Sequence, residues 1–499
     1  MSNLSELIPA GSGGKTAEFV ASGALPNGQS VILNANGTIT AVTGSGSAQD
    51  IPAGSNVVYS STTVNDQTIA FDPNTANKFA IAYQFDQGST GRIVIGTVSG
   101  NSLSFGGAVT FSSSNVELVK VSFDPNTANK LAIAYIDVAS SGAGTVIIGT
   151  VSGTSVSFGS KQVFNSGATT QIDMQFDPIN SGGKFVVVYK DNGNSSYGTS
   201  RVGTVSGSSV SYGTEVVYAS SNTAESSIAF DRNTSNKYVI AYQNASNSQL
   251  GTAICGTISG TNSSYGSAVI FGTGASDKIS IAFEKSVTGR FIIAFNNGVA
   301  GGDPVAKAVI GALSGSTISF GALVTIQAGN YAGNVIALAC DDSVANRAII
   351  GYTGDGISPK IGRIYPVTID GNSITVDTPI VYANSETVQQ RVSFDPNTAG
   401  KFVYIFSASN GTAFVGKMNS LSTNLTATNF VGMPDKAYAS GATATVSLEG
   451  GVSTNQTSLT IGSTYYVQSN GTLATSAATP SVEAGRAMSA TSILIKGNK

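Results

Sequence analysis

The chain has 499 residues, of which 41% are hydrophobic and only 11% are charged, and its formal net charge is −3. The sequence contains no histidine, which excludes the commonest general base and the commonest transition-metal ligand. Because the basic residues are scattered and no apolar run is long enough to span a membrane, we expect neither nucleic acid nor membrane as a partner. The 59 glycines indicate many turns, as is typical of an all-β protein with short strands.

The N-terminal flank, residues 1–50, begins without the basic segment and the apolar stretch of a secretory signal. Further along this flank, Asn36-Gly37 stands between two short apolar segments, and this dipeptide is a strong hairpin-turn signal. The flank therefore predicts a β-hairpin.

Seven copies of one motif follow the N-terminal flank. The octapeptide Phe-Asp-Pro-Asn-Thr-Ala-Asn-Lys occurs unchanged at residues 71–78 and 123–130, and weaker copies recur further along the chain. By subtraction of their positions, the acidic residues of successive copies lie 52, 53, 54, 53, 57 and 54 residues apart: Asp72, Asp124, Asp177, Asp231, Glu284, Asp341 and Asp395. Repeats of this length with β-branched, alternating segments are typical of β-propeller blades.

Each copy predicts four strands. In the second copy these are residues 119–123, 131–135 and 145–151, and then a short strand at 156–158 that follows a glycine-containing turn. Large and small residues alternate along 131–135, so both faces of this strand are apolar, as a strand stacked between two blades requires.

The two ends of the repeat array complement each other. Val57–Ser60 resembles a fourth strand without its first three, whereas the seventh copy stops after its third strand at residues 414–417. The N-terminal strand would therefore complete the last blade and remove two open sheet edges. The sequence predicts an all-β fold with a seven-bladed β-propeller over residues 51–420, closed by this strand.

The C-terminal flank, residues 421–499, resembles the N-terminal flank locally. Residues 462–473 can be aligned with residues 28–39, and Asn470-Gly471 repeats the hairpin dipeptide. Because closure of the ring brings both chain ends together, we expect residues 1–50 and 421–499 to pack as one small β module.

The flanks also carry a family resemblance. Residues 4–13, and the ending from 459–467 through 484–487 to 492–497, resemble the ends of structural proteins from tailed bacteriophages, especially marine ones. The central repeats are similar to the propeller-like repeats of such proteins. The resemblance implies a virion component, a tail fibre or other tail appendage that contributes to host attachment or docks on other virion proteins.

The same resemblance implies a location in the phage particle and, as partners, other tail or capsid proteins and a host-surface receptor or glycan. Such appendages are often trimers, so a homo-oligomer is a further expectation. Two alternatives stay open: a capsid decoration or fibre protein, and a glycan-degrading enzyme similar to a tailspike.

The repeated acidic residue has a functional and a structural interpretation. Asp124, Asn126 and Asn129 offer oxygen ligands of the kind that Ca²⁺ prefers. However, each copy ends in a cation, and the fifth copy lacks the first of these asparagines. A residue that every blade needs is needed for building blades. We therefore interpret all seven acidic residues as structural turns, and we expect no metal and no cofactor.

Loops that differ among the copies are better candidates for a binding site. Candidate contacts between the second and third strands are Asp137 in the second copy, Asn194 and Tyr197 in the third, and Asp303 in the fifth. The alternative is that these segments are exposed hairpin tips that tolerate changes in length.

No constellation in the sequence predicts catalysis. Carboxylates recur by symmetry, and the adjacent Asp341 and Asp342 would point to opposite faces of a strand. We expect no enzyme. Cys255 and Cys340 fall in different repeats, so we predict free, buried thiols and no disulfide.

Overall fold

The computed structural model describes residues 15–45, 51–180, 182–298, 305–327, 336–353, 361–418, 422–468, 471–475 and 481–496. Pairings between the named strands are all antiparallel, and the only helix in these ranges is the 3₁₀ turn η2 (Val138–Ser140). No described helix has the length and apolar character needed to cross a membrane. The predicted all-β fold is confirmed.

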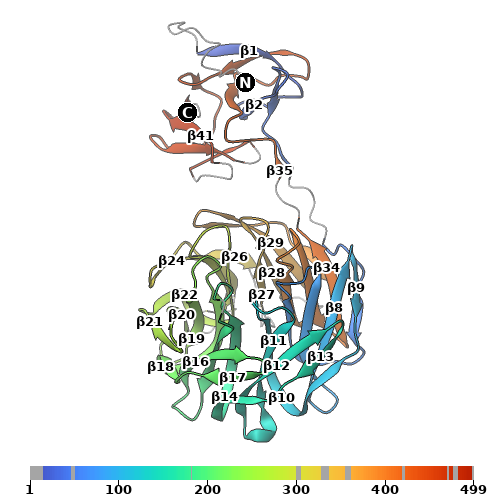
Figure 1. Cartoon of the computed structure of the whole chain (residues 1–499). Helices are drawn as coiled ribbons and strands as arrows, with labels where there is room; N and C mark the ends of the chain where they lie inside the picture. The colour runs from blue at the N-terminus through green and yellow to red at the C-terminus, as the bar shows by residue number, and fades with distance from the viewer. Residues whose placement is uncertain are drawn as a thin grey trace. The chain divides into compact units, whose positions relative to one another are not determined.

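The chain divides into two compact units, one made of residues 50–418 and the other of residues 1–49 with 419–499. These boundaries lie within two residues of those predicted from the sequence. The larger unit holds the repeats, and the smaller one holds both chain ends (Figure 1).

Strands of the larger unit pair in groups, which we number 1 to 7 in chain order. Group 1 has β6 (Val64–Phe71), β7 (Lys78–Phe85), β8 (Thr90–Ser99) and β9 (Ser102–Phe105), and group 2 has β10 (Val109–Phe123), β11 (Lys130–Asp137), β12 (Ala143–Ser152) and β13 (Ser155–Phe158). Group 3 has β14 (Gln162–Phe176), β15 (Lys184–Asp191), β16 (Tyr197–Ser206) and β17 (Ser209–Tyr212), and group 4 has β18 (Val216–Phe230), β19 (Lys237–Asn244), β20 (Leu250–Ser259) and β21 (Asn262–Tyr265). Group 5 has β22 (Val269–Phe283), β23 (Arg290–Asn297), β24 (Val305–Ser314), β25 (Thr317–Phe320) and β26 (Val324–Gln327). Group 6 has β27 (Ala337–Cys340), β28 (Arg347–Thr353), β29 (Gly362–Asp370), β30 (Ser373–Val376) and β31 (Ile380–Ala383), and group 7 has β32 (Val388–Phe394), β33 (Lys401–Ser407), β34 (Gly411–Lys417) and β5 (Val57–Ser60).

Group 2 shows the common pattern (Figure 1). The second half of β10 is the inner strand, and it pairs with β11, which pairs with β12. The outer edge of β12 is shared: residues 149–152 pair with β13, and residues 143–146 pair with the first half of β14. The second half of β14 then pairs with β15 and becomes the inner strand of group 3. Each long strand thus links the outer edge of one group to the inner edge of the next.

The groups form a closed cycle. Inner strands of successive groups contact one another in order, and the inner strand of group 7, β32, contacts that of group 1, β6. In group 7 the outer partner of β34 is β5, with Ala413 opposite Val57 and Gly411 opposite Ser60. The segment that the sequence assigned to the last repeat therefore occupies its outer edge.

The second strand of each group is the centre of its core. In β11, Leu131, Ile133 and Tyr135 pack with side chains of group 1, whereas Ala132 and Ala134 pack with those of group 3. All five are at most 1% exposed. The alternation of large and small residues thus reports packing on both faces of the strand, as the sequence predicted.

Glycines of the third strands lie against the second strands, and this contact can be tested. A Cβ on Gly203 would lie 2.2 Å from the ring of Phe185, which is fully buried. In group 2 a Cβ on Gly149 would meet the flexible end of Leu131 at 2.8 Å. We expect Gly203→Ala to lower the free energy of unfolding by about 2–3 kcal/mol through overpacking, and Gly149→Ala to lower it less. Urea denaturation measures both, and equal losses would show that the ring is not the cause.

The smaller unit interleaves the two chain ends. Its first sheet has the order β1 (Thr16–Val20), β37 (Thr443–Ser447), β36 (Phe430–Pro434), β2 (Val31–Leu33) and β3 (Ile39–Ala41). Strands from the C-terminal flank therefore lie between strands from the N-terminal flank, so neither end makes this sheet alone. The remaining pairings are those of β4 (Gly44–Ser45) with β35 (Ser422–Thr423), and the sheet β38 (Val452–Ser453), β42 (Ile493–Ile495), β41 (Glu483–Ala487), β39 (Thr464–Val467) and β40 (Leu473–Ala474).

Two hydrophobic clusters in this unit each combine residues from both ends of the chain. Ile32 and Val42 from the N-terminal flank pack with Phe430, Met433 and Tyr465 from the C-terminal flank. The two segments that align in sequence both form hairpins, β2 with β3 and β39 with β40.

Candidate functional site

The repeated acidic residues follow the inner strands directly, and all are at most 2% exposed. In each copy, one carboxylate oxygen accepts a hydrogen bond of 2.8–2.9 Å from the backbone N–H two residues later. This is the geometry of a turn fixed by an acidic side chain, and it occurs at Asp72, Asp124, Asp177, Asp231, Glu284, Asp341 and Asp395.

Several of these carboxylates also bind the next group. Backbone N–H groups of Asn236, Asn346 and Asn77 donate to Asp177 at 2.7 Å, to Glu284 at 3.3 Å and to Asp395 at 2.9 Å, respectively. Each bond runs from the group that follows in the cycle, and the last one joins group 1 to group 7. The repeated motif therefore connects neighbouring groups as well as forming a turn.

Of the predicted loop contacts, Asp137 is not in an exposed loop. Strand β11 continues two residues beyond Tyr135, and Asp137 at its end is 1% exposed. Its Oδ2 accepts hydrogen bonds from Lys161 Nζ at 2.6 Å and Ser140 Oγ at 2.9 Å. Burial alone would raise the pKa of Asp137, but these hydrogen bonds and the charge of Lys161 outweigh it and lower the pKa. Asp137 is therefore not an exposed loop residue but a buried carboxylate that pairs with the half-exposed Lys161.

Two of the other predicted contacts, Asn194 and Tyr197, lie at the turn that joins β15 to β16. Asn194 is exposed in the turn between β15 and β16, where its carbonyl accepts a hydrogen bond from the N–H of Tyr197 at 3.0 Å. Tyr197 is half-buried and begins β16, opposite Asp191. Asp303 lies outside the described residues. The structure therefore brings together only Asn194 and Tyr197.

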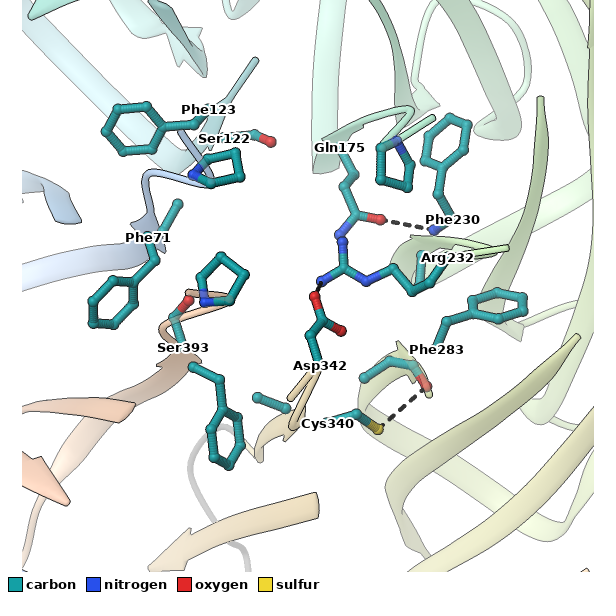
Figure 2. A pocket seen from close by; sticks show the side chains of 18 of the residues that line it. Phe71, Ser122, Phe123, Gln175, Phe230, Arg232, Phe283, Cys340, Asp342 and Ser393 are labelled. Atoms are coloured by element: carbon teal, nitrogen blue, oxygen red, sulfur yellow. Dashed lines mark hydrogen bonds and ion pairs between the residues drawn. The ribbon is translucent and has the colours of Figure 1, made fainter. Parts of the chain in front are cut away.

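A cavity of 510 Å³ lies among the ends of the inner strands (Figure 2). All seven groups contribute to it, each through the last residues of its inner strand, such as Phe71 and Phe123, and through the residue after the repeated acid. The cavity is therefore built from positions about one repeat apart in the sequence.

Repeat symmetry is broken at the position after the acidic residue. Four groups place proline there: Pro73, Pro125, Pro178 and Pro396. Three consecutive groups, 4 to 6, instead place charged residues on the wall of the cavity: Arg232, Lys285 and Asp342. One arc of the wall is thus charged, and the same position in the other four groups is a rigid, apolar proline.

The charged arc contains an ion pair. Nη2 of Arg232 lies 2.6 Å from Oδ2 of Asp342, with side-chain exposures of 32% and 9%. The pair joins group 4 to group 6, and Figure 2 shows the two side chains meeting in the cavity. Oδ1 of Asp342 is buried and has no hydrogen-bond partner among the described residues. Lys285, from group 5, is exposed.

Neutral groups complete this part of the cavity. The side-chain oxygen of Gln175 accepts a hydrogen bond from the N–H of Phe230 at 2.7 Å, and Cys340 Sγ lies 3.8 Å from the carbonyl oxygen of Ala282. Burial is the main cause that raises the pKa of the Cys340 thiol, so the thiol is neutral.

Cys255 and Cys340 are both free and buried, as predicted. No three Cys, Asp or Glu side chains within the described ranges are grouped so as to hold a metal ion.

Sequence reasoning missed this site, although a signal was present. The search for asymmetry compared the lengths of loops, whereas the informative difference lies inside the motif, where proline changes to Arg232, Lys285 and Asp342. The side chains of the adjacent Asp341 and Asp342 have different partners, as their positions in the sequence suggested. Asp341 accepts a hydrogen bond from the N–H of Ser343 at 2.8 Å, and Asp342 binds Arg232. A comparison of the copies position by position would have found the charged arc.

Asp341 is expected to make the free energy of unfolding depend on pH. Burial raises its pKa to about 6, although hydrogen bonds from Ser343 and Val344 act in the opposite direction. Because its ordinary pKa is about 4, the fold favours the protonated form. Its contribution to the free energy of unfolding is therefore fully present below pH 4 and falls by about 2–3 kcal/mol as the pH rises to 6.

Asp341→Asn keeps an acceptor oxygen without a charge. We expect this variant to lack the fall between pH 4 and pH 6 and to exceed the wild-type protein in stability at pH 8. Urea unfolding at intervals from pH 4 to pH 8 measures the difference. A variant that is less stable by the same amount at every pH would contradict this assignment.

No protein-family model and no curated protein sequence matches this chain. Among solved structures, it is similar to Sqt1 from Chaetomium thermophilum bound to the N-terminus of ribosomal protein L10, with a TM-score of 0.46 and 12% identity, over 70% of this chain and 84% of that chain. Sqt1 alone gives a TM-score of 0.46 with 11% identity, over 72% and 97%. AofleA from Arthrobotrys oligospora gives 0.42 with 10% identity, over 74% and 99%. At these TM-scores, the similarities carry no argument about function.

Proposed function

We propose that the larger unit is a seven-bladed β-propeller and that the protein is a structural component of a phage virion, part of a tail fibre or tail appendage. In this role it contributes to host attachment or docks on other virion proteins. The closed cycle of inner strands, with β5 on the outer edge of group 7, supports the propeller.

The observation that carries the virion role is the smaller unit. Both chain ends leave the repeats and share one sheet, β1-β37-β36-β2-β3, and the same unit holds residues 459–467 and 484–487, which resemble those of phage structural proteins. Such a chain has two folded parts with separate cores. One part can dock on a neighbouring virion protein while the other presents a rigid, ligand-sized cavity.

The cavity suits binding. Asp342 is held in a close ion pair with Arg232, and the repeated carboxylates are all engaged in turns. A general acid or base needs a pKa matched to its task and access to the proton that it transfers. A buried carboxylate fixed on a guanidinium instead offers a defined place for a hydrogen-bond donor. We therefore propose a binding protein.

Labelling intact particles tests the virion role. Antibody against the purified protein, detected by electron microscopy on the phage that encodes it, is expected to mark the tail. Label on the head would favour the capsid decoration or fibre protein, and particles without any label would overturn the proposal.

Two further measurements separate attachment from the other roles. The purified protein is expected to compete with the phage for adsorption to host cells. Shortening of the host surface polysaccharide during incubation with the protein would instead favour the tailspike-like enzyme.

A further inference from the structure

The strongest indication of a ligand is the carboxylate of Asp342. Its side chain is 91% buried by subtraction of its 9% exposure, and one oxygen is bound to Arg232. The other oxygen, Oδ1, is buried without a hydrogen-bond donor from the described residues, and Asp342 is one of the residues that line the cavity. Leaving a buried charged acceptor without a hydrogen bond costs free energy. A ligand that turns this oxygen toward the cavity and brings a hydroxyl group to it would recover that free energy.

The two cations beside Asp342 call for a different group on the same ligand. Arg232 uses Nη2 for the ion pair, and its side chain is still 32% exposed, while Lys285 from the intervening group is exposed on the same arc. Two cations and one anion leave this arc with a net positive charge. A guanidinium binds carboxylates well because its planar N–H groups match their geometry. The arc therefore suits a ligand that has a carboxylate next to a hydroxyl.

The remaining wall argues against an extended peptide. Side chains of the preceding groups already occupy backbone N–H groups on the inner strands: Ser122 Oγ accepts from Phe176 at 3.4 Å, and Gln175 Oε1 accepts from Phe230 at 2.7 Å. Asp173 Oδ2 does the same for Ile228 at 3.0 Å. A peptide that binds by adding a strand needs such groups free. The four prolines offer instead a rigid surface for the C–H groups of a sugar ring.

The volume also fits a small ligand, because pockets for such molecules span about 300–1,000 Å³ and this cavity measures 510 Å³. We propose that the cavity binds an acidic saccharide, with its carboxylate on Arg232 and Lys285 and a hydroxyl group on Oδ1 of Asp342. The saccharide would be the host-surface ligand, so its biological meaning rests on the attachment role proposed above.

Binding is tested with D-galacturonic acid and D-galactose, which differ in the group at C6. Ligand-observed NMR titrations of the full chain are expected to show at least tenfold tighter binding of the acid, and weaker binding of it as salt increases. Equal affinities for the two sugars, or no binding of the acid, would overturn the proposal. A tripeptide that binds more tightly than the acid would overturn it in favour of a peptide ligand.

The repeat itself supplies the variant. Proline stands after the acidic residue in four groups, so Arg232→Pro/Lys285→Pro/Asp342→Pro gives all seven groups proline at this position. We expect this variant to fold, as circular dichroism would show, and to lose at least tenfold in affinity for galacturonic acid. If it folds and binds as the wild-type protein does, the site is elsewhere.

Single substitutions keep the test decisive if the triple variant fails to fold. Lys285→Met leaves the ion pair intact and is expected to weaken binding several-fold, whereas Lys285→Arg should retain it. Lys436→Met, at an exposed lysine of the smaller unit, is the matched control and should change nothing. An unchanged affinity in Lys285→Met would remove Lys285 from the site. Saccharide binding without label on particles would refute the virion role alone, and labelled particles without saccharide binding would refute this site alone.

Discussion

Replacement of Asp395 by alanine is expected to lower the free energy of unfolding by about 3–5 kcal/mol, because each donor left unsatisfied costs about 1–3 kcal/mol. The carboxylate is fully buried at the junction of the last and first groups. Oδ1 accepts the N–H of Asn397 at 2.9 Å, and Oδ2 accepts Thr398 Oγ1 at 2.8 Å and the N–H of Asn77 at 2.9 Å. Urea denaturation of the full chain measures the loss.

Two controls show whether closure of the cycle is responsible. Asp395→Asn keeps one acceptor oxygen and is expected to cost less than Asp395→Ala. Asp124→Ala removes the same turn within the cycle, where the chain itself connects the neighbouring groups. Because β5 is held in group 7 by its pairing with β34 and not by a short chain connection, limited proteolysis should cleave Asp395→Ala faster than Asp124→Ala. Equal cleavage and equal stability would show that closure adds nothing to the turn.

The repeats were predictable because their packing leaves a periodic pattern. Alternation along residues 131–135 reports that both faces of β11 are buried, and both are. The end of the same strand was missed. Ile136 and Asp137 pair with Gly144 and Ala143, but a polar residue at a strand end carries no hydrophobic signal. Asp137 was therefore assigned to an exposed loop although Lys161, from beyond β13, covers it.

The cavity was harder to foresee, because residues far apart in sequence build it. Arg232 and Asp342 are 110 positions apart, and their contact skips group 5. The sequence of a single repeat does not indicate that the residue after the acid faces the centre of the cycle. That position follows from how the groups are arranged. The change from proline to charge in three consecutive copies was visible, but its meaning depends on that geometry.

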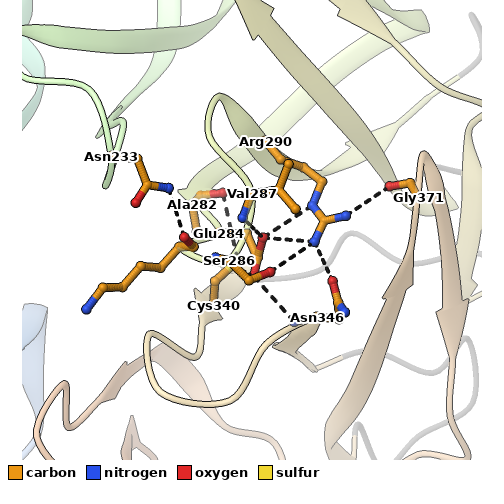
Figure 3. A network of polar contacts seen from close by, with 10 residues as sticks. Asn233, Ala282, Glu284, Ser286, Val287, Arg290, Cys340, Asn346 and Gly371 are labelled. Carbon is orange, nitrogen blue, oxygen red and sulfur yellow. Dashed lines mark hydrogen bonds and ion pairs between the residues drawn. The ribbon is translucent and has the colours of Figure 1, made fainter. Parts of the chain in front are cut away.

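In the fifth copy of the motif, the repeated acid forms an ion pair with the cation of the same copy (Figure 3). Among the ion pairs of the described residues, this is the only copy that does so. Oε2 of Glu284 accepts hydrogen bonds from Arg290 at 2.9 and 3.2 Å. Glu284 is fully buried, and the side chain of Arg290 is 9% exposed. Arg290 also donates to the carbonyl oxygen of Gly371 at 3.3 Å and to the side-chain oxygen of Asn346. The pair therefore connects group 5 to group 6.

Glu284→Ala is expected to lower the free energy of unfolding by about 3–5 kcal/mol, because it leaves the guanidinium of Arg290 buried without its counter-charge. The double variant Glu284→Gln/Arg290→Met removes both charges and should be more stable than Glu284→Ala. If the double variant were as unstable as Glu284→Ala, lost packing rather than an unpaired charge would be the cause.

The pH dependence of the free energy of unfolding tests the role of Glu284 a second time. Its direction is opposite to that expected for Asp341. Burial alone would raise the pKa of Glu284, but hydrogen bonds from Ser286 and the charge of Arg290 outweigh it and lower the pKa. The stabilisation is therefore fully present above the ordinary pKa of about 4.3 and is lost as the pH falls through the lowered value. Urea unfolding should show a large difference between wild-type protein and Glu284→Ala at pH 7 and a smaller one at pH 3. A difference that stays constant would mean that the carboxylate acts by its shape and not by its charge.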